Sequence, residues 1–243
     1  MLGFGKKKKQ ESVQRGRFVV IDGTDGSGKG TQTKMLIDTL KQEGFDVEVL
    51  DFPQYGQKSA GMVEEYLNGK YGQVSPKASS IFYAIDRFDA SFKLREWLKA
   101  GKVVVSNRYV TASAGHQGGK ISDRVERLKF FRWLSNLEYE IYNIPKPDLN
   151  LILHVPAETA QELVDRKSAE ERAYAGGKKR DLHEADLQHL KNAEKVFLEI
   201  TELFPNTKLI ECVEEGLLLS PQSVHNKVWQ LVRRIALKDY KVS

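Results

Sequence analysis

The sequence predicts an α/β fold in which helices cover both faces of a five-stranded parallel sheet. Five short runs consist almost entirely of apolar and β-branched residues, as expected for strands that are buried on both faces. Segments with the helical spacing of apolar residues separate these runs, and the alternation of strand and helix favours a parallel sheet. The predicted strands are residues 17–22, 47–52, 102–107, 149–155 and 207–212.

The helical segments show the expected periodicity and start signals. The first places Met35, Leu36 and Leu40 on one face. Ser220 followed by Pro221 is typical of an N-cap and a first helical residue, so the last helix begins there. Ligands of such folds bind beyond the carboxyl ends of the strands, where we expect the functional residues. The predicted helices are 29–43, 76–99, 126–142, 186–203 and 221–235.

Composition narrows the class of protein. The length of 243 residues suits one domain with a full core. No run approaches the ~18 apolar residues of a membrane helix, and the charged N-terminus lacks the apolar segment of a secretory signal. Cys212 is the only cysteine, which excludes an intrachain disulfide and a cysteine-based zinc site. We therefore expect a cytoplasmic protein.

The chain divides into a domain and two tails. We predict the domain at 16–238, a basic tail at 1–15 and a C-terminal tail at 239–243. The run Lys6–Lys9 contributes to the net charge of +5 and is typical of a solvated tail, with nucleic-acid contact as the alternative. Residues 166–184 hold many charges and few large apolar residues. Their composition fits a surface helix–loop–helix and equally a mobile lid.

A phosphate-binding motif follows the first predicted strand. The segment from Gly23 to Lys29 matches G-x-x-x-x-G-K and opens the first predicted helix. Its glycines let backbone N–H groups converge on phosphate oxygens, and the helix N-terminus and the lysine add positive charge. The motif predicts a three-layer α/β/α P-loop NTPase fold. The predicted ATP-binding residues are Gly23, Asp25, Gly26, Ser27, Gly28, Lys29, Gly30 and Thr31.

Asp25 is an unusual residue inside such a loop. Bound phosphates repel a carboxylate, so a plain ATPase gains nothing from it. The residue is explained if it accepts a hydrogen bond from a sugar hydroxyl or carries water to a cation. A second nucleotide near the triphosphate would supply that hydroxyl.

Arginines and aromatics elsewhere suit a nucleoside monophosphate. Arg87 lies on the long predicted helix, one turn after Tyr83, and Arg108 follows the third strand. Guanidinium groups bind phosphate in a bidentate manner, and an aromatic ring can stack on a base. Taken singly, each aromatic is also explained by core packing.

Together these motifs resemble the thymidylate kinases. The resemblance spans Arg17 to Leu237 and keeps the motif order: the P-loop with its internal acid, "FP" at 52–53, "DR" at 86–87, "RY" to "QGG" at 108–119, and "KPD" at 146–148. The "GKGTQ" at 28–32 also resembles the related adenylate kinases. The resemblance implies ATP-dependent, Mg²⁺-dependent phosphorylation of dTMP to dTDP by a homodimer.

The resemblance also implies a role for each acceptor-side residue. Asp25 would bind the 3′-hydroxyl side of dTMP and Arg108 its phosphate, while Tyr83 would stack on thymine. Further residues would be Arg87 at the O4 edge of the base, Phe52 and Tyr55 near the acceptor phosphate, Ser113 and Gln117 at the base and sugar, and His116 where an aromatic commonly blocks a 2′-hydroxyl.

The resemblance assigns the catalytic charge to the loop and to the segment 166–184. The P-loop has no arginine between Asp25 and Lys29, so Arg172 and Arg180 are the candidates for stabilising transition-state charge, with Asp181 and Glu184 as the acidic pair that follows. The predicted catalytic residues are Lys29, Asp25, Arg108, Arg172 and Arg180.

Departures from the family pattern concern magnesium and selectivity. Gly30 stands where the motif usually has a hydroxyl, and Asn107 stands where the family has an aspartate. Both weaken the magnesium site, which we assign to Thr31, Asp25 and Asn107 with the ATP phosphates. His116 leaves discrimination against ribonucleotides open. The alternatives are a kinase for another nucleoside monophosphate and a non-catalytic nucleotide-dependent binding protein.

Overall fold

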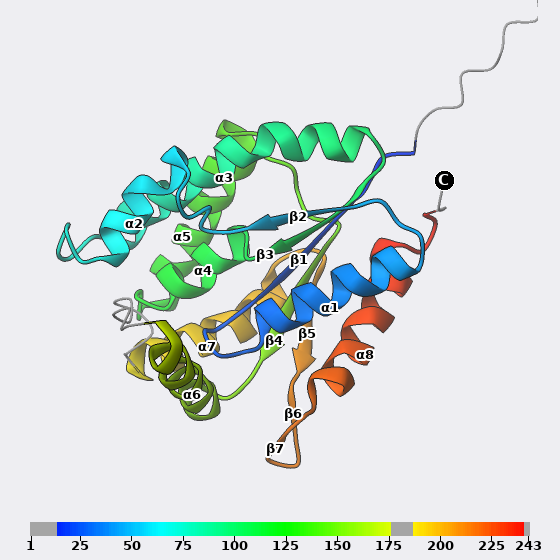
Figure 1. The fold of residues 1–243 in the computed structure, drawn as a ribbon. Helices are drawn as coiled ribbons and strands as arrows, with labels where there is room; N and C mark the ends of the chain where they lie inside the picture. Colours follow the sequence, from blue (N-terminus) through cyan, green and yellow to red (C-terminus); the bar gives the residue numbers. More distant parts are fainter. Residues whose placement is uncertain (1–13, 176–186, 241–243) are drawn as a thin grey trace, which may run out of the picture.

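The computed structural model describes residues 14–175 and 187–240, with side chains given except at 167–175. Within this part, five parallel strands form one sheet in the order β2-β3-β1-β4-β5 (Figure 1). The predicted fold class and all five predicted strands are confirmed, with small shifts at the strand ends. The strands are β1 (Arg17–Gly23), β2 (Val47–Asp51), β3 (Val103–Asn107), β4 (Leu149–His154) and β5 (Thr207–Glu211).

Helices cover both faces of this sheet, as Figure 1 shows. They are α1 (Lys29–Gln42), α2 (Gly61–Leu67), α3 (Pro76–Lys99), α4 (Val110–Gly118), α5 (Arg124–Ser135), α6 (Ala157–Ala175), α7 (Leu187–Leu203) and α8 (Pro221–Leu231). Two π-helical turns, η2 (Asn136–Ile141) and η3 (Val232–Ala236), extend α5 and α8, and a 3₁₀ turn, η1 (Lys58–Ala60), precedes α2. A small antiparallel hairpin of β6 (Val213–Glu214) and β7 (Leu217–Leu218) follows β5.

The two faces of the sheet form two apolar cores. In β1, Val19 and Ile21 pack with residues of α1 and α8 on one face, and Phe18 and Val20 pack with residues of α3, α4 and α7 on the other. All four side chains are fully buried. Alternate burial on both faces explains why β1 is an uninterrupted apolar run, and it places the loop after β1 at the centre of the sheet edge.

Helix starts follow the capping rules where the sequence carries the signal. Ser75 and Ser220 accept hydrogen bonds from the backbone N–H groups of Ala78 and Ser223, and each precedes a proline. The start predicted for α8 is confirmed. The helix predicted at 126–142 is partly wrong, because α5 begins two residues earlier, at Arg124 after its N-cap Asp123, and the α-helix gives way to the π-helical turn η2.

Several elements differ from the predicted boundaries. The helices α2, α4 and α6 were not among the predicted helices, and α6 extends into the segment 166–184. Gln14 and Arg15, assigned to the basic tail, bond to Asp239 and Asp148. The run Lys6–Lys9 lies outside the described residues. In the described part of the chain, no helix combines the length and apolar character needed to cross a membrane.

The contact between α4 and α7 gives a stability prediction. A Cβ built on Gly115 would lie 2.4 Å from Cζ of Phe197, a side chain that is 2 % exposed. We expect Gly115→Ala to lower the free energy of unfolding by about 1–3 kcal/mol, since the buried ring must be displaced. Chemical denaturation monitored by circular dichroism measures the change.

Gly61→Ala is the matched control. Like Gly115, Gly61 is a helical residue without a positive φ angle, but an added Cβ there would meet nothing within 4 Å. Its stability should stay unchanged or rise by up to about 1 kcal/mol from helix propensity. Equal effects of the two substitutions would contradict the assigned packing of α4 on α7.

Candidate active site

The P-loop connects the central strand β1 to the N-terminus of α1, as predicted. Gly26 has a φ angle of 82°, and a Cβ there would lie 2.2 Å from the backbone oxygen of Ala160 in α6. Only glycine fits this close approach. Lys29 donates from Nζ to the backbone oxygen of Thr24 at 2.8 Å and lies 3.7 Å from Oδ1 of Asp25. The eight predicted ATP-binding residues together form this loop and the first turn of α1.

Arg108 reaches the P-loop from the end of the neighbouring strand β3. Its φ angle of 66° is left-handed, a conformation that costs an L-residue on the order of 1–3 kcal/mol. Its backbone N–H bonds to the oxygen of Ile21 at 2.9 Å, which fixes it against β1. Its Nη2 forms an ion pair with Asp25, and its Nη1 donates to Nε2 of His116 at 2.9 Å. Arg108 thus connects the P-loop, the end of β3 and α4.

These contacts shift the titration of the charged groups. Burial alone would raise the pKa of Asp25, yet Arg108 and Lys29 together hold it well below the ordinary value. Burial and the charge of Arg108 lower the pKa of Lys29 to about 8. Burial lowers the pKa of His116 well below its usual range. His116 is therefore neutral at pH 7, which agrees with its Nε2 accepting a hydrogen bond from a guanidinium.

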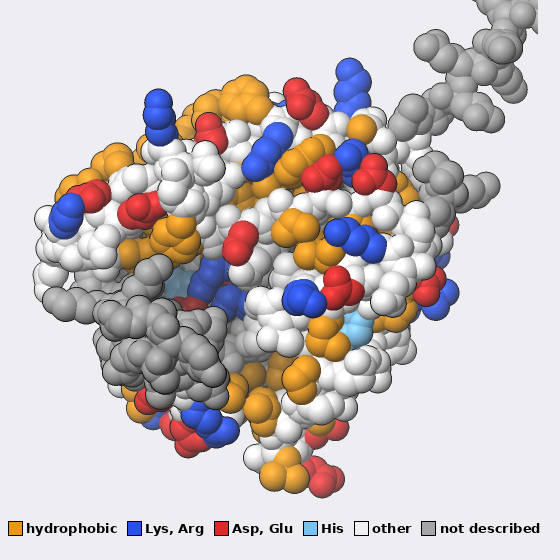
Figure 2. All heavy atoms as spheres, in the orientation of Figure 1, with side chains coloured by type: hydrophobic (Ala, Val, Ile, Leu, Met, Phe, Trp, Pro, Cys, Tyr) orange, Lys and Arg blue, Asp and Glu red, His pale blue; other side chains and the backbone are white. Residues whose placement is uncertain are grey.

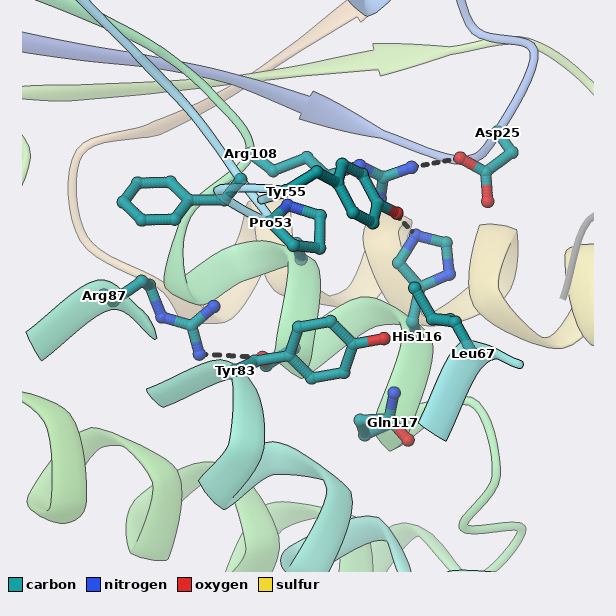
Figure 3. A pocket seen from close by; sticks show the side chains of 12 residues that line it. Asp25, Pro53, Tyr55, Leu67, Tyr83, Arg87, Arg108, His116 and Gln117 are labelled. Carbon is teal, nitrogen blue, oxygen red and sulfur yellow. Dashed lines mark hydrogen bonds and ion pairs between the residues drawn. The ribbon is translucent and has the colours of Figure 1, made fainter. Parts of the chain in front are cut away.

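A cavity opens beside this cluster (Figure 3). It contains about 550 Å³ of free space, part of it open to solvent. In Figure 2, Lys or Arg side chains and a histidine lie in a hollow within the face shown. All nine predicted acceptor-side residues line this cavity, and Pro53, Leu67 and Ala112, which had no predicted role, complete its lining. The nine are Asp25, Phe52, Tyr55, Tyr83, Arg87, Arg108, Ser113, His116 and Gln117.

Arg87 is the main surprise among them. Its side chain is 2 % exposed and pairs with Glu138, which is fully buried. Nε lies 3.0 and 3.1 Å from the two carboxylate oxygens, and Nη2 also bonds to Glu138 and to Oγ of Ser113, the latter at 2.9 Å. The predicted partner of Arg87 was the O4 edge of the acceptor base, and Glu138 had no predicted role. The π-helical turn η2, which carries this residue, gives no periodic signal that would have revealed it.

The floor of the cavity is held by contacts between helices. Oγ of Ser79 donates to Oε1 of Gln117 at 2.8 Å, which leaves the amide nitrogen of Gln117 toward the cavity. Tyr83 packs edge-to-face on Tyr66 of α2, with ring centroids 6.4 Å apart. The hydroxyl of Tyr66 in turn accepts a hydrogen bond from Lys120 at 2.7 Å. The ring of Tyr83 is therefore held in place by α2 as well as by its own helix.

Asp22 is a second buried carboxylate with no predicted role. It is fully buried at the end of β1 and accepts hydrogen bonds from Oγ1 of Thr111 at 2.7 Å and from the N–H of Gly23 at 2.9 Å. Burial raises its pKa. The residue ties the start of the P-loop to the start of α4, which carries Ser113, His116 and Gln117.

The residues assigned to magnesium lie around the loop without forming a complete ligand set. In the described residues, no three His, Cys, Asp or Glu side chains are placed to hold a metal. Nδ2 of Asn107 donates to Oδ1 of Asp51 at 2.8 Å, while its Oδ1 is buried with no partner in the described structure. Thr31 is exposed on α1, and a Cβ on Gly30 would meet nothing within 4 Å. A buried oxygen without a partner and an incomplete set of protein ligands fit a hydrated cation held mainly by phosphates.

The predicted residues of the segment 166–184 are only partly visible. Arg172 belongs to α6, but its side chain lies outside the described residues, as do Arg180, Asp181 and Glu184 entirely. Their assignment stays a prediction.

A P-loop that shares a carboxylate with a cavity lined by arginines and aromatics defines a P-loop phosphotransferase with two adjoining sites. The family model described as thymidylate kinase matches residues 21–224, and the chain belongs to the thymidylate kinase family. Its reaction is the ATP-dependent phosphorylation of dTMP to dTDP.

Individual relatives agree over most of the chain. A thymidylate kinase of Bradyrhizobium sp. is 30% identical over 222 residues, 90% of each chain. A probable thymidylate kinase of Thermococcus onnurineus is 28% identical over 231 residues, 91% of this chain and 99% of that one. The solved thymidylate kinase of Candida albicans has the same fold, with a TM-score of 0.67 at 21% identity over 90% of this chain and 92% of that one.

The buried pair of Arg87 and Glu138 generates a second prediction. Glu138→Gln leaves a buried guanidinium without its counter-charge and should destabilise the protein by about 3–5 kcal/mol. The double variant Glu138→Gln with Arg87→Met should lose less stability than the two single variants lose in sum, because no unpaired buried charge remains in it. Urea unfolding of all three variants measures this.

Glu126→Gln is the control, since Glu126 pairs with Lys129 and both side chains are about 60% exposed. Its effect should stay below about 1 kcal/mol. If Glu138→Gln costs no more than this control, the pair is not the buried interaction described.

Proposed function

We propose that phosphoryl transfer from ATP to dTMP takes place where the P-loop meets the cavity, at Asp25. One observation carries this proposal: Asp25 belongs to the donor loop, lines the acceptor cavity and pairs with Arg108. ATP phosphates over Lys29 and an acceptor phosphate at Arg108 would then face each other. Positioning of two phosphates is the larger part of phosphoryl-transfer catalysis.

The base end of the cavity suits a neutral pyrimidine. Glu138 balances the charge of Arg87, so the guanidinium acts there as a hydrogen-bond donor of fixed position. The hydroxyl of Ser113 accepts from Arg87 and has its own proton left to donate, and the amide nitrogen of Gln117 faces the cavity. Carbonyl oxygens of thymine would accept from these groups, with Tyr83 stacked on the ring.

The sugar and phosphate end is charged. Asp25 would accept a hydrogen bond from the 3′-hydroxyl, and Arg108 would bind the phosphate, with Phe52 and Tyr55 beside it. His116 is neutral and already accepts from Arg108, so it positions that guanidinium as well as lining the sugar pocket. The cavity therefore has a charge-balanced, neutral base end and an ionic end with Asp25 and Arg108. A nucleoside monophosphate likewise has a neutral base and a charged phosphate.

The remaining charge would come from magnesium and from the segment 166–184. Mg²⁺ would be held by Thr31, Asp25 and Asn107 with the ATP phosphates, and it would neutralise charge on the transferring group. Arg172 and Arg180 remain the predicted sources of a transition-state cation, a contribution on the order of 10³-fold or more.

The activity prediction follows from the two cations. ADP release with dTMP should require Mg²⁺, and Lys29→Ala and Arg108→Ala should each lower kcat/KM by on the order of 100- to 1000-fold. A coupled assay across the common nucleoside monophosphates, with and without Mg²⁺, measures both the rate and the choice of acceptor.

Lys34→Ala is the matched control on the same helix, because Lys34 is exposed and pairs only with Asp38 among the described residues. Its activity should equal that of the wild type. Turnover of AMP or CMP in place of dTMP would contradict the acceptor proposal, and activity in Lys29→Ala would contradict the assigned donor site.

A homodimer is supported by the outer face of α3. Ile81, Ile85, Phe88 and Phe92 recur at helical spacing and are all partly exposed, with Phe92 at 58 %. Figure 2 shows hydrophobic side chains along the upper edge of the molecule over α3. We propose that the α3 face of a second copy covers this stripe, since an isologous two-fold contact pairs one patch with itself.

Phe92→Glu should convert the dimer to a monomer, because pairing about a two-fold axis would bury two added carboxylates. Sedimentation equilibrium at micromolar concentration measures the mass. Leu217→Glu is the control, since this equally apolar residue is 73 % exposed on the β6–β7 hairpin. A monomeric wild type, or a dimer unaffected by Phe92→Glu, would contradict the proposal.

A further inference from the structure

The ends of β2 and β3 carry a polar pair that the proposed site does not yet use. Asp51 and Asn107 are direct partners in the parallel register, and Nδ2 of Asn107 donates to Oδ1 of Asp51 at 2.8 Å. Asp51 is exposed at the edge of the sheet, and the next residue, Phe52, lines the cavity. The pair therefore lies at the same sheet edge as the P-loop.

The hydrogen bond fixes which way the Asn107 amide faces. A carboxylate only accepts hydrogen bonds, so the amide nitrogen must face Asp51. The amide oxygen then points away, where it is buried and has no partner in the described part of the chain. Oδ2 of Asp51 likewise receives no hydrogen bond from the described residues. The pair therefore carries one negative charge, an acceptor oxygen on the exposed Asp51 and a buried amide oxygen on Asn107.

The surroundings of the pair are those of the triphosphate site. The charges of Arg108 and Lys29 both reach the Asp51 carboxylate. The backbone of Asn107 lies beside Ile21 of β1, two residues before Gly23. A Cβ at Gly30 would enter open space. A cation beside the triphosphate would therefore have the exposed carboxylate of Asp51 near it at the end of β2.

We propose that Asp51 is a positioning residue for the magnesium ion of Mg–ATP, supplying from β2 the charge that Asn107 does not supply from β3. The inference rests on the proposed function. Mg²⁺ requires near-octahedral coordination and usually keeps several waters. The exposed carboxylate of Asp51 would accept a hydrogen bond from such a water, and Asn107 would hold that carboxylate in place through Nδ2. The net charge at the strand ends then equals that of an aspartate on β3 beside a neutral residue on β2.

Metal binding tests this without relying on turnover. Mn²⁺ titrated into the complex of the protein with ATP, followed by electron paramagnetic resonance, gives the metal affinity directly. We expect Asp51→Asn to raise the Kd for Mn²⁺ on the order of 10-fold, as loss of an outer-shell partner does. The affinity for metal-free ATP should stay the same or rise, because a negative charge near the phosphates is lost.

The charge swap is the decisive variant. Asp51→Asn combined with Asn107→Asp keeps one carboxylate and one amide at the pair, and it should restore the Mn²⁺ Kd to within about 2-fold of the wild type. Glu48→Gln is the control for charge on β2, since Glu48 pairs with Lys102. It should leave the Mn²⁺ affinity unchanged. Circular dichroism establishes that each variant is folded.

The outcomes separate the two proposals. Unchanged Mn²⁺ affinity in Asp51→Asn, or a swap variant as weak as Asp51→Asn, would overturn the role of Asp51 while ATP binding still supports the donor site. If the wild type binds ATP neither with nor without metal, the proposed function is overturned. The inference about Asp51 then falls as well.

Discussion

The ion pair between Asp25 and Arg108 joins the two halves of the site. Asp25 belongs to the loop after β1 and Arg108 to the turn after β3, and the pair exists because these strands are neighbours at the centre of the sheet. The left-handed backbone at Arg108 turns its side chain back toward the loop. Asp22 and His116 then hold the loop and the guanidinium to α4. A different strand order would place donor and acceptor groups apart.

Charge is distributed unevenly along the cavity, and this unevenness matches the chemistry of the family's substrate. At the base end, Glu138 cancels the charge of Arg87 inside the protein, and only directional donors remain. At the loop end, Arg108 and Asp25 line the cavity as an ion pair, and Nζ of Lys29 lies 3.7 Å from the same carboxylate. Burying the neutral pair costs desolvation that a well-placed hydrogen-bond network repays only in part. The pair is thus explained better by recognition than by stability.

The sequence was sufficient for the features that depend on local pattern. Buried strands read as apolar runs, and Ser–Pro caps and the P-loop carry their own signals. The helix α4 was missed because all its residues are buried and several are glycine, alanine or serine, so it has no polar face to give a period. Glu138 was missed because a π-helical turn shifts the register by which its direction would be judged. The arginines and Tyr83 followed from residue type and position, and the remaining acceptor residues from motif resemblance. The partners Glu138 of Arg87 and Ser79 of Gln117 came only from the fold.

The close approach of Gly26 to Ala160 has a consequence for how this protein can change over time. The backbone of α6 occupies the place where any side chain at position 26 would begin. A substitution at Gly26 is therefore not an independent event, since it requires α6 to retreat from the loop as well. The P-loop and the start of α6 are therefore expected to change together: a side chain at position 26 can be accepted only where the backbone near Ala160 lies farther from the loop.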